Sequence, residues 1–335
     1  MRREVGGGVS LPGAMTETTL RAAPVPAPAP APAPATSDGA APAIRRVAVL
    51  GGGLMGSGIA EVCAQAGFDT VVREVSEGAC QRALVAVERS LGRAVEKGKL
   101  DAAARDATLD RLTLTTDLDA LADRDLVIEA VVEDLEVKNA AWRELDALCP
   151  PATLFASNTS SLTIAAMAAV TARGDRMVGL HFFNPVPAMR LVEVVRTVTT
   201  SEATLTRAFA FARALGKEPI LAKDSAGFVV NLLLVPYLLD AIRQLERGVA
   251  GVRDVDTGMR LGAGHPMGPC ELADFIGLDT LWRVAEIMWG EYRDARYAPP
   301  PLLRRMVLAG LYGRKSGRGF YDYAQDPPQP VALGL

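Results

Sequence analysis

A single histidine in apolar surroundings is the strongest candidate for proton chemistry in this sequence. His181, in "HFFNPVP", is one of only two histidines among 335 residues. Imidazole is the side chain best suited to moving a proton near neutral pH. The alternative is a histidine packed into the core, which its apolar neighbours also allow.

A carboxylate in the next strand-like segment strengthens the first interpretation. Glu193 lies in "LVEVV", between valines and a leucine. Burying a carboxylate there is costly unless it is paired. We therefore expect Glu193 to bind one ring nitrogen of His181 and to stabilise the imidazolium, leaving the other nitrogen free as a base. The alternative is an edge strand with Glu193 in water.

A glycine-rich turn opens the folded part of the sequence. In "RRVAVLGGGLMGSGIAEVCAQAG", an apolar run precedes Gly51, Gly53 and Gly56, which are spaced G-x-G-x-x-G, and a helical pattern begins at Leu54 and Met55. The first glycine permits a tight turn, the second lets the backbone approach a pyrophosphate, and the third allows close helix–strand packing. Free amide groups at the helix start then face the phosphates. The pattern predicts a dinucleotide site.

The end of the second strand-like segment indicates which dinucleotide is bound. Glu74, in "DTVVREV", follows the glycines at the expected distance. An acid there accepts hydrogen bonds from a ribose and repels a 2′-phosphate, which favours NAD over NADP. Arg73 weakens this inference because its side chain could reach a phosphate. The alternative is that Glu74 is a solvated carboxylate at a strand end.

Strands that alternate with helices predict an α/β fold, a Rossmann-type doubly wound and mostly parallel sheet. Strand-like runs occur in "VAVL", "DTVVREV", "LTLTT", "DLVIEAV", "TLFASNT", "RMVGLHFF" and "LVEVVRT". Ligands of such sheets bind beyond the carboxyl ends of the strands. Polar residues follow three of these ends, and we expect them to gather on one rim: Glu129, Glu133, Asn158, Ser160, Ser161, His181 and Asn184.

Two further polar residues could contact a substrate, and each has a structural alternative. Ser160 lies in "SNTSSL", a segment that is also typical of the N-cap of a short helix. Asn231 lies on an apolar helix, where a buried amide needs partners. A substrate oxygen is one candidate partner for Asn231.

Three residues have ordinary interpretations from the sequence alone. Lys138 is four residues after Asp134 on an expected helix start, a spacing that favours an ion pair within the helix. Ser90 and Lys97 are expected on the exposed side of a long helix, as surface residues.

The composition excludes several classes of function. Acidic residues outnumber basic ones by 39 to 36, so no basic surface suited to nucleic acid is expected. Cys63, Cys80, Cys149 and Cys270 form no CxxC pair and have no neighbouring histidine at ligand spacing. We therefore expect neither a metal site nor a disulfide framework, and a reducing, cytoplasmic location.

The two ends of the sequence differ from the rest. Residues 1–43 contain the alternating run "APVPAPAPAPAPA" and predict a disordered, solvated tail. The opening residues have no apolar stretch of signal-peptide length, and Met15 is an alternative start. Residues 326–335 are expected to form a second tail.

The last third of the sequence predicts an all-helical domain. Residues 226–242 are apolar but are interrupted by Asn231, Pro236 and Asp240, so we expect a buried helix and no membrane span. His265 lies in a Gly/Pro-rich turn, where we expect a structural role. Further helical patterns occupy residues 252–262, 269–276, 279–289 and 301–310.

These motifs together resemble the short-chain L-3-hydroxyacyl-CoA dehydrogenases, with the bacterial 3-hydroxybutyryl-CoA dehydrogenases as the nearest form. The resemblance runs from about residue 44 to 324, through "GGGLMGSGIA", "VIEAVVEDLEVK", "SNTSSL", "HFFNPVP", "LVEVV", "GFVVN" and "GRKSGRGFYDY". It implies a NAD-binding Rossmann domain over residues 44–222. A helical domain for substrate binding and dimerisation would follow over residues 223–325.

The resemblance also implies roles for individual residues. His181 is the implied general base, oriented by Glu193, and Ser160 and Asn231 would hydrogen-bond the reacting oxygen. Ser90 and Lys97 would contact coenzyme A. The implied reaction is reversible, NAD-dependent oxidation of an (S)-3-hydroxyacyl-CoA by a homodimer. Residues implied to contact NAD are Gly51, Gly53, Leu54, Met55, Gly56, Glu74, Glu133, Lys138, Ser160, Asn184 and Lys315.

The sequence departs from the family pattern at one junction. The family usually has D-x-P-G-F-x-x-N-R where this chain has "DSAGFVVNL", so Ala226 and Leu232 replace a proline and an arginine. Losing the proline loosens the preset backbone, which puts domain closure in question. A dehydrogenase of free hydroxy acids or of 3-hydroxyadipyl-CoA is one alternative function. A non-catalytic, crystallin-like NAD-binding protein is another, and the presence of His181 and Glu193 argues against it.

Overall fold

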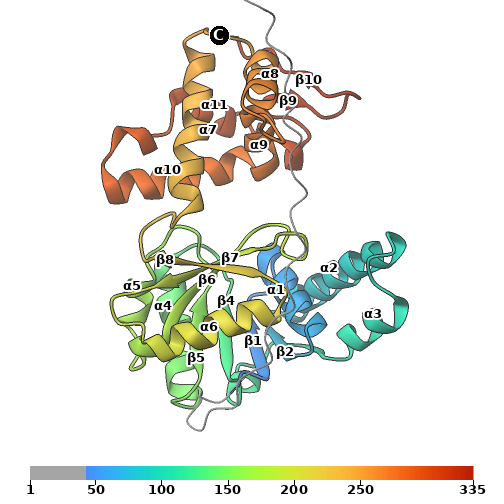
Figure 1. Cartoon of the computed structure of the whole chain (residues 1–335), viewed down its shortest axis with the longest axis vertical. Helices are drawn as coiled ribbons and strands as arrows, with labels where there is room; N and C mark the ends of the chain where they lie inside the picture. Colours follow the sequence, from blue (N-terminus) through green and yellow to red (C-terminus); the bar gives the residue numbers. More distant parts are fainter. Residues whose placement is uncertain (1–42, 335) are drawn as a thin grey trace, which may run out of the picture. The chain divides into compact units, whose positions relative to one another are not determined.

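One mixed β-sheet underlies the first part of the chain. The computed structural model describes residues 43–334, which contain an eight-stranded sheet in the order β3-β2-β1-β4-β5-β6-β7-β8 (Figure 1). The predicted tail over residues 1–43 lies outside the described residues except for its last residue. The strands are β1 (Arg46–Leu50), β2 (Asp69–Arg73), β3 (Leu112–Thr115), β4 (Leu126–Glu129), β5 (Leu154–Ser157), β6 (Met177–Phe182), β7 (Leu191–Arg196) and β8 (Glu218–Lys223).

The direction of the strands confirms the predicted Rossmann-type sheet. All neighbours from β3 to β6 pair in parallel, whereas β7 is antiparallel to β6 and parallel to β8. The strand β8 was not predicted from the sequence. Its segment "EPILAK" contains a proline and has a single buried side chain, both of which suit an edge strand and obscure its pattern.

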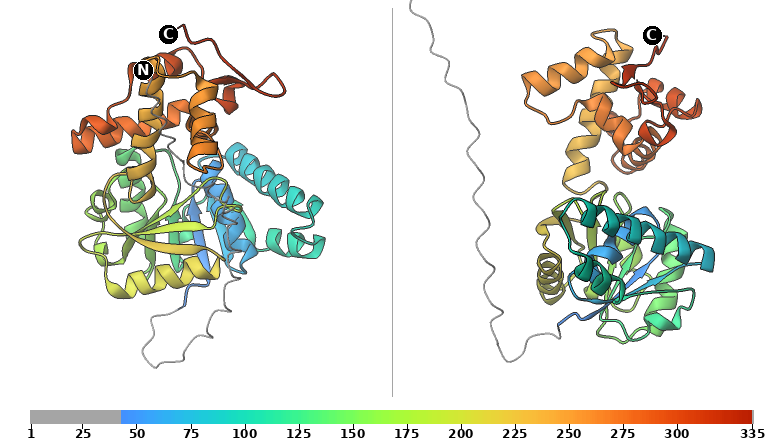
Figure 2. Two further views of the ribbon diagram at one scale, coloured as in Figure 1. Left: turned by 45° about the horizontal axis from the view of Figure 1, so that its top comes forward. Right: turned by 90° about the vertical axis from the view of Figure 1, so that its right-hand side faces the viewer.

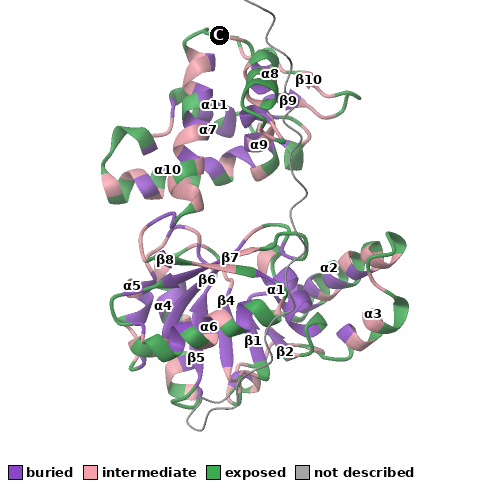
Figure 3. Ribbon diagram, in the orientation of Figure 1, coloured by how far each residue is buried: buried purple, intermediate pink, exposed green. Residues whose placement is uncertain are grey.

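Helices cover both faces of the sheet, as a doubly wound fold requires. Apolar side chains of α1 and α6 pack with the sheet in one buried cluster, and those of α4 and α5 pack in another. Figure 3 shows the strands as a largely buried layer, and the α2–α3 helix pair, which contacts α1, extends from it (Figure 2). These helices are α1 (Leu54–Gln65), α2 (Glu77–Glu96), α3 (Ala102–Leu109), α4 (Leu135–Leu148), α5 (Ile164–Ala168) and α6 (Glu202–Ala214).

The second part of the chain is helical, and the predicted segments match it closely. Its apolar core is a separate buried cluster. None of the helices within residues 43–334 is both long enough and apolar enough to cross a bilayer. The elements are α7 (Val230–Glu246), α8 (Val252–Gly262), α9 (Pro269–Ile276), α10 (Leu278–Tyr292), α11 (Pro301–Leu308), and the short strands β9 (Tyr321–Asp322) and β10 (Gln329–Pro330).

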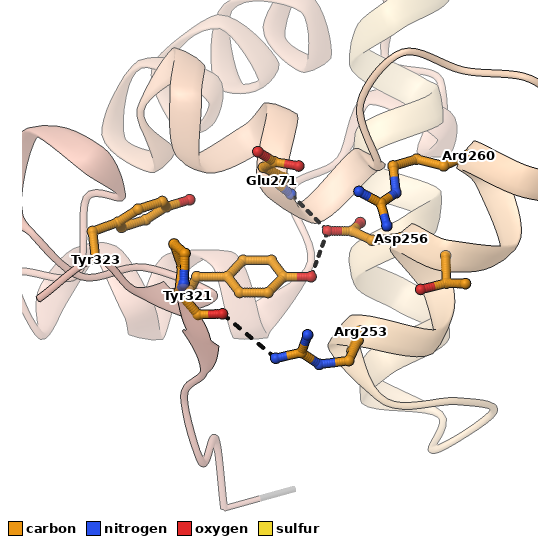
Figure 4. A pocket seen from close by; sticks show the side chains of 8 residues that line it. Arg253, Asp256, Arg260, Glu271, Tyr321 and Tyr323 are labelled. Carbon is orange, nitrogen blue, oxygen red and sulfur yellow. Dashed lines mark hydrogen bonds between the residues drawn. The ribbon is translucent and has the colours of Figure 1, made fainter. Parts of the chain in front are cut away.

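A buried carboxylate joins α8, α9 and β9 within the helical part. Asp256 on α8 is 3% exposed and accepts hydrogen bonds from the N–H groups of Cys270 and Glu271 at 2.7 and 3.0 Å. It also accepts the Tyr321 hydroxyl at 2.8 Å (Figure 4). This carboxylate forms one wall of a pocket of about 230 Å³. Asp256 therefore caps α9 and fixes β9 against it.

Asp256→Ala is expected to lower the free energy of unfolding by about 3 kcal/mol or more, because it leaves three donors, two of them buried, without an acceptor. Urea denaturation followed by circular dichroism measures the change. The matched control is Asp254→Ala, which removes an exposed carboxylate from the same helix and is expected to cost about 1 kcal/mol or less. Equal losses in the two variants would contradict this role of Asp256.

Candidate active site

The glycine turn has the geometry that a bound pyrophosphate needs. Gly51 has φ +92°, and a Cβ there would lie 2.9 Å from the carbonyl oxygen of Ala130. A Cβ on Gly56 would lie 1.8 Å from the carbonyl oxygen of Gly51, so only glycine fits. Gly53 has open space beside it and precedes α1, whose N-terminus has no side-chain cap. The uncapped amide groups of α1 are therefore available to an anion.

Gly56→Ala is expected to weaken NADH binding by about tenfold to a hundredfold, because its Cβ displaces the turn and misaligns charge-assisted hydrogen bonds. Fluorescence titration of NADH measures the dissociation constant. Gly290→Ala is the matched control, since Gly290 lies on an exposed helical position of α10 with free space for a methyl group. Unchanged NADH affinity in Gly56→Ala would contradict the predicted dinucleotide site.

An acidic side chain lies beside the same turn. Glu74 follows β2, and its Oε1 accepts the N–H of Gly52 at 2.6 Å. Arg73 donates from Nε to the carbonyl oxygen of Thr116 at 3.3 Å, so its guanidinium is engaged with the β3 side of the sheet. The carboxylate, and not the guanidinium, is thus the charged group bonded to the glycine turn.

His181 and Glu193 form a buried pair, as the sequence predicted. They are direct partners in the antiparallel register of β6 and β7, and Nδ1 of His181 lies 2.5 Å from Oε2 of Glu193. Glu193 is 0% exposed and His181 is 6% exposed. The alternative of Glu193 in water on an edge strand is wrong, because β7 lies between β6 and β8.

Glu193 also holds the start of α7. Its Oε1 accepts the N–H groups of Val229 and Val230 at 3.0 and 2.9 Å, in place of a side-chain cap from α7 itself. Phe228, with φ +48°, places its ring 5.5 Å from the imidazole. An ionised Glu193 can only accept, so Nδ1 of His181 donates to it and Nε2 is left as the free nitrogen.

The polar residues at three strand ends are linked to one another, as expected for a single rim. Glu129, at the end of β4, is 0% exposed and binds Lys138 Nζ at 2.5 Å and the Ser157 hydroxyl at 2.6 Å. Asn158, after β5, accepts the N–H of Phe182 at 2.9 Å. These bonds bring the ends of β4, β5 and β6 together.

Lys138 lies inside this network, so the ion pair with Asp134 is wrong. Lys138 is 1% exposed and lies 3.2 Å from Glu133 as well as against Glu129. Asp134 instead caps α4 by accepting the N–H groups of Glu136 and Val137. The four-residue spacing predicted the wrong pair because Asp134 is the N-cap that precedes the first helical residue. Its carboxylate accepts backbone N–H groups and is not directed at Lys138.

Known proteins match this chain over nearly all of its described length. The family models "3-hydroxyacyl-CoA dehydrogenase, NAD binding domain" and "3-hydroxyacyl-CoA dehydrogenase, C-terminal domain" match residues 46–225 and 227–323. The chain belongs to the 3-hydroxyacyl-CoA dehydrogenase family. The resemblance seen in the sequence is thereby confirmed, and with it a dehydrogenase that uses a nicotinamide dinucleotide.

Individual relatives within the family are similar at high identity. The 3-hydroxybutyryl-CoA dehydrogenase of Mycobacterium tuberculosis is 53% identical over 283 residues, covering 84% of this chain and 99% of that protein. The human mitochondrial hydroxyacyl-coenzyme A dehydrogenase is 44% identical over 288 residues, covering 84% and 91%. The crystal structure of (S)-3-hydroxybutyryl-CoA dehydrogenase from Ralstonia eutropha has a TM-score of 0.81 at 44% identity, covering 84% of this chain and 100% of that one.

Ser160 and Asn231, the two residues expected at the reacting oxygen of a family substrate, are both half-buried. Neither side chain has a hydrogen-bond partner among the described residues, so both are available to a ligand. The N-cap alternative for "SNTSSL" is wrong, because Asp224 binds the N–H groups of Ile164 and Ala165 at the start of α5.

The remaining hydroxyls of that segment bind Glu133. Thr159 and Ser161 both donate to Oε1 of Glu133, the Ser161 bond being 3.0 Å long. Burial raises the pKa of Glu133, but the Lys138 charge and these hydroxyls outweigh it, so the pKa lies below its usual value. Glu133 is therefore held ionised at the rim.

Ser90 differs from its predicted surface position. It is half-buried, and its hydroxyl donates to Oε1 of Glu61 at 3.0 Å. Lys97, immediately after α2, is exposed as expected. Sequence reasoning missed Glu61, although an acid in the apolar run "GIAEVCA" is the same signal that identified Glu193.

The last two residues predicted to contact NAD lie in different settings. Asn184 is exposed, two residues after β6. Lys315 lies in the helical part, where its Nζ is 2.5 Å from Oδ1 of Asp279. Their contacts with NAD stay predictions.

The two departures from the family pattern are accommodated by local contacts. The carbonyl oxygen of Ala226 accepts the Tyr292 hydroxyl at 2.8 Å. Leu232 packs against the apolar cluster of the helical part. The junction is therefore held by a tyrosine hydrogen bond and apolar packing where the family usually has proline and arginine.

Proposed function

We propose that this chain catalyses the reversible, NAD-dependent oxidation of an (S)-3-hydroxyacyl-CoA to the 3-oxoacyl-CoA, with 3-hydroxybutyryl-CoA as a substrate. The relatives named 3-hydroxybutyryl-CoA dehydrogenase support the substrate. The observation that carries the proposal is the buried pair of His181 and Glu193 at 2.5 Å. A carboxylate-oriented imidazole is a suitable acid and base for an alcohol–ketone interconversion.

The residues of the glycine turn fit a dinucleotide. The space beside Gly53, the uncapped start of α1 and the carboxylate of Glu74 would hold its pyrophosphate and ribose. Leu54 and Met55 begin the helix there, and Lys138 with Glu133 lies on the same rim. When bound, NAD supplies the hydride acceptor.

In the proposed mechanism, His181 moves one proton. Nδ1 donates to Glu193, and Nε2 takes the proton of the substrate hydroxyl during oxidation. The imidazolium formed is stabilised by the Glu193 carboxylate, and it returns the proton during reduction. Ser160 and Asn231 orient the substrate oxygen toward Nε2 through hydrogen bonds.

We propose NAD, and not NADP, as the cofactor. The Glu74 carboxylate bonded to the glycine turn would repel a 2′-phosphate, whereas Arg73 is bonded to the carbonyl oxygen of Thr116. Loss of the NADH absorbance at about 340 nm on addition of acetoacetyl-CoA tests the whole proposal. NADPH in a parallel assay is expected to react much more slowly. A protein that binds NADH but does not consume it would contradict the proposed function.

We also propose that residues 44–222 bind the cofactor and that residues 223–325 bind substrate and form a homodimer, with Ser90 and Lys97 contacting coenzyme A. Exposed apolar side chains on α7, α8 and α11 support a subunit interface: Leu233, Leu261 and Leu308. Light scattering coupled to gel filtration measures the mass in solution, and a monomer would contradict the dimer.

A further inference from the structure

A buried acid on α1 has no role in the mechanism above. Glu61 lies two turns after the glycine loop and is 3% exposed. Its hydrogen-bond partner among the described residues is the Ser90 hydroxyl of α2, at 3.0 Å. Burial raises the pKa of Glu61 to about 7, against the opposing effects of Ser90, Arg93 and Lys217. Its charge therefore changes near neutral pH.

Two basic groups act on the charge of Glu61, one on α2 and one just before β8. Arg93 lies on α2, one turn after Ser90. Lys217 precedes β8 and is 8% exposed, and burial lowers its pKa. The Lys217 amine donates to the carbonyl oxygens of Val186 and Met189 at 2.6 and 2.8 Å. Glu61 thus lies between α2 and the loop that follows His181.

The charge of Glu61 decides what Ser90 can offer a ligand. An ionised carboxylate only accepts hydrogen bonds, so the single hydroxyl proton of Ser90 is committed to Glu61. Toward a ligand, the two lone pairs of the Ser90 oxygen can then only accept. A protonated Glu61 removes this constraint, since the carboxyl can itself donate to one of these lone pairs. The Ser90 proton is then free to point at the ligand, where it opposes an N–H group.

We propose that Glu61 is a positioning residue whose carboxylate fixes Ser90 as a hydrogen-bond acceptor for an N–H group of the acyl-CoA. This inference rests on the proposed function, which places Ser90 at the coenzyme A portion of the substrate. The pantetheine amides and the adenine amino group are the N–H donors that such an acceptor fits. We expect NADH binding to be independent of both residues, because they are bonded to each other and not to the glycine turn.

The test is the dissociation constant of acetoacetyl-CoA, measured by equilibrium titration without cofactor from about pH 6 to about pH 8.5. In the unsubstituted protein it is expected to rise about threefold to tenfold as pH falls through the Glu61 transition. Glu61→Gln keeps an acceptor for Ser90 at every pH. In this variant the rise of about threefold to tenfold in the dissociation constant at low pH is expected to be absent. Ser90→Ala is expected to bind weakly at all pH values. His181 is present in all of these proteins, so differences between their profiles report Glu61.

The matched control is Glu88→Gln, which removes an exposed carboxylate from α2 and is expected to keep the original pH profile. The NADH dissociation constant is expected to be unchanged in every variant. Parallel acetoacetyl-CoA profiles for the unsubstituted protein and Glu61→Gln would overturn the inference while leaving the proposed function intact. An unsubstituted protein that never oxidises NADH with acetoacetyl-CoA would overturn the proposed function, and this inference with it.

Stability measurements separate positioning from folding. The folded-state pKa of Glu61 is raised from 4.5 to about 7, so the folded protein binds the extra proton and loses stability as pH rises between these values. Glu61→Gln removes that loss and is expected to have a higher melting temperature than the unsubstituted protein at about pH 8. A destabilised Glu61→Gln at that pH would overturn the assignment of a buried, ionised Glu61.

Discussion

His181→Gln is expected to lower kcat for the reduction of acetoacetyl-CoA by about a hundredfold to ten-thousandfold. Glutamine has nearly the length of histidine but cannot take up or release a proton near neutral pH. The NADH dissociation constant is expected to stay nearly unchanged, because His181 pairs with Glu193 and makes no bond to the glycine turn. Steady-state kinetics and a fluorescence titration of NADH measure the two quantities.

The second histidine provides the matched control for this variant. His265 lies in the helical part, where its Nδ1 is 3.0 Å from the Tyr237 hydroxyl. His265→Gln is expected to retain most of the activity, because the His265 ring is bonded to the Tyr237 hydroxyl and, among residues 43–334, to no carboxylate. Full activity in His181→Gln, or equal losses in the two variants, would contradict the assignment of His181.

Glu193→Gln is expected to lower kcat for the oxidation of (S)-3-hydroxybutyryl-CoA by about a hundredfold or more. The N–H groups of Val229 and Val230 both point at Oε1, so the amide oxygen of the glutamine must stay there. Its NH₂ group then faces Nδ1 of His181, which must accept. Nε2 consequently carries the ring proton, and the imidazole is in the wrong tautomer to act as a base.

This variant separates orientation from folding, because the capping of α7 is preserved. Glu193→Gln is expected to unfold at nearly the temperature of the unsubstituted protein, whereas Glu193→Ala leaves two buried N–H groups unpaired and is expected to be clearly less stable. Glu202→Gln is the control, since Glu202 is an exposed acid paired with Arg196. Normal oxidation rates in Glu193→Gln would show that the carboxylate does not set the state of His181.

Local patterns in the sequence were sufficient for the glycine turn, the helical segments and the pairing of His181 with Glu193. The turn depends on backbone conformations that only glycine adopts at Gly51, and on a contact that only glycine permits at Gly56. The two pair residues are twelve positions apart on adjacent strands, so a short connection sets their register. Glu193 is flanked by valines, and a carboxylate buried in such a segment requires a partner, which predicted the pair.

The tertiary structure alone decided the partners that come from distant segments. Glu193 meets the start of α7, 36 residues away, and Asp224 caps a helix 60 residues before it. Ser90 is half-buried and donates to Glu61, where a surface position was expected. Lys138 binds Glu129 in place of the expected Asp134. Periodicity records which face of an element is apolar, but a buried charge is satisfied by whichever group the topology brings within about 3 Å. That choice exists only once the chain has folded.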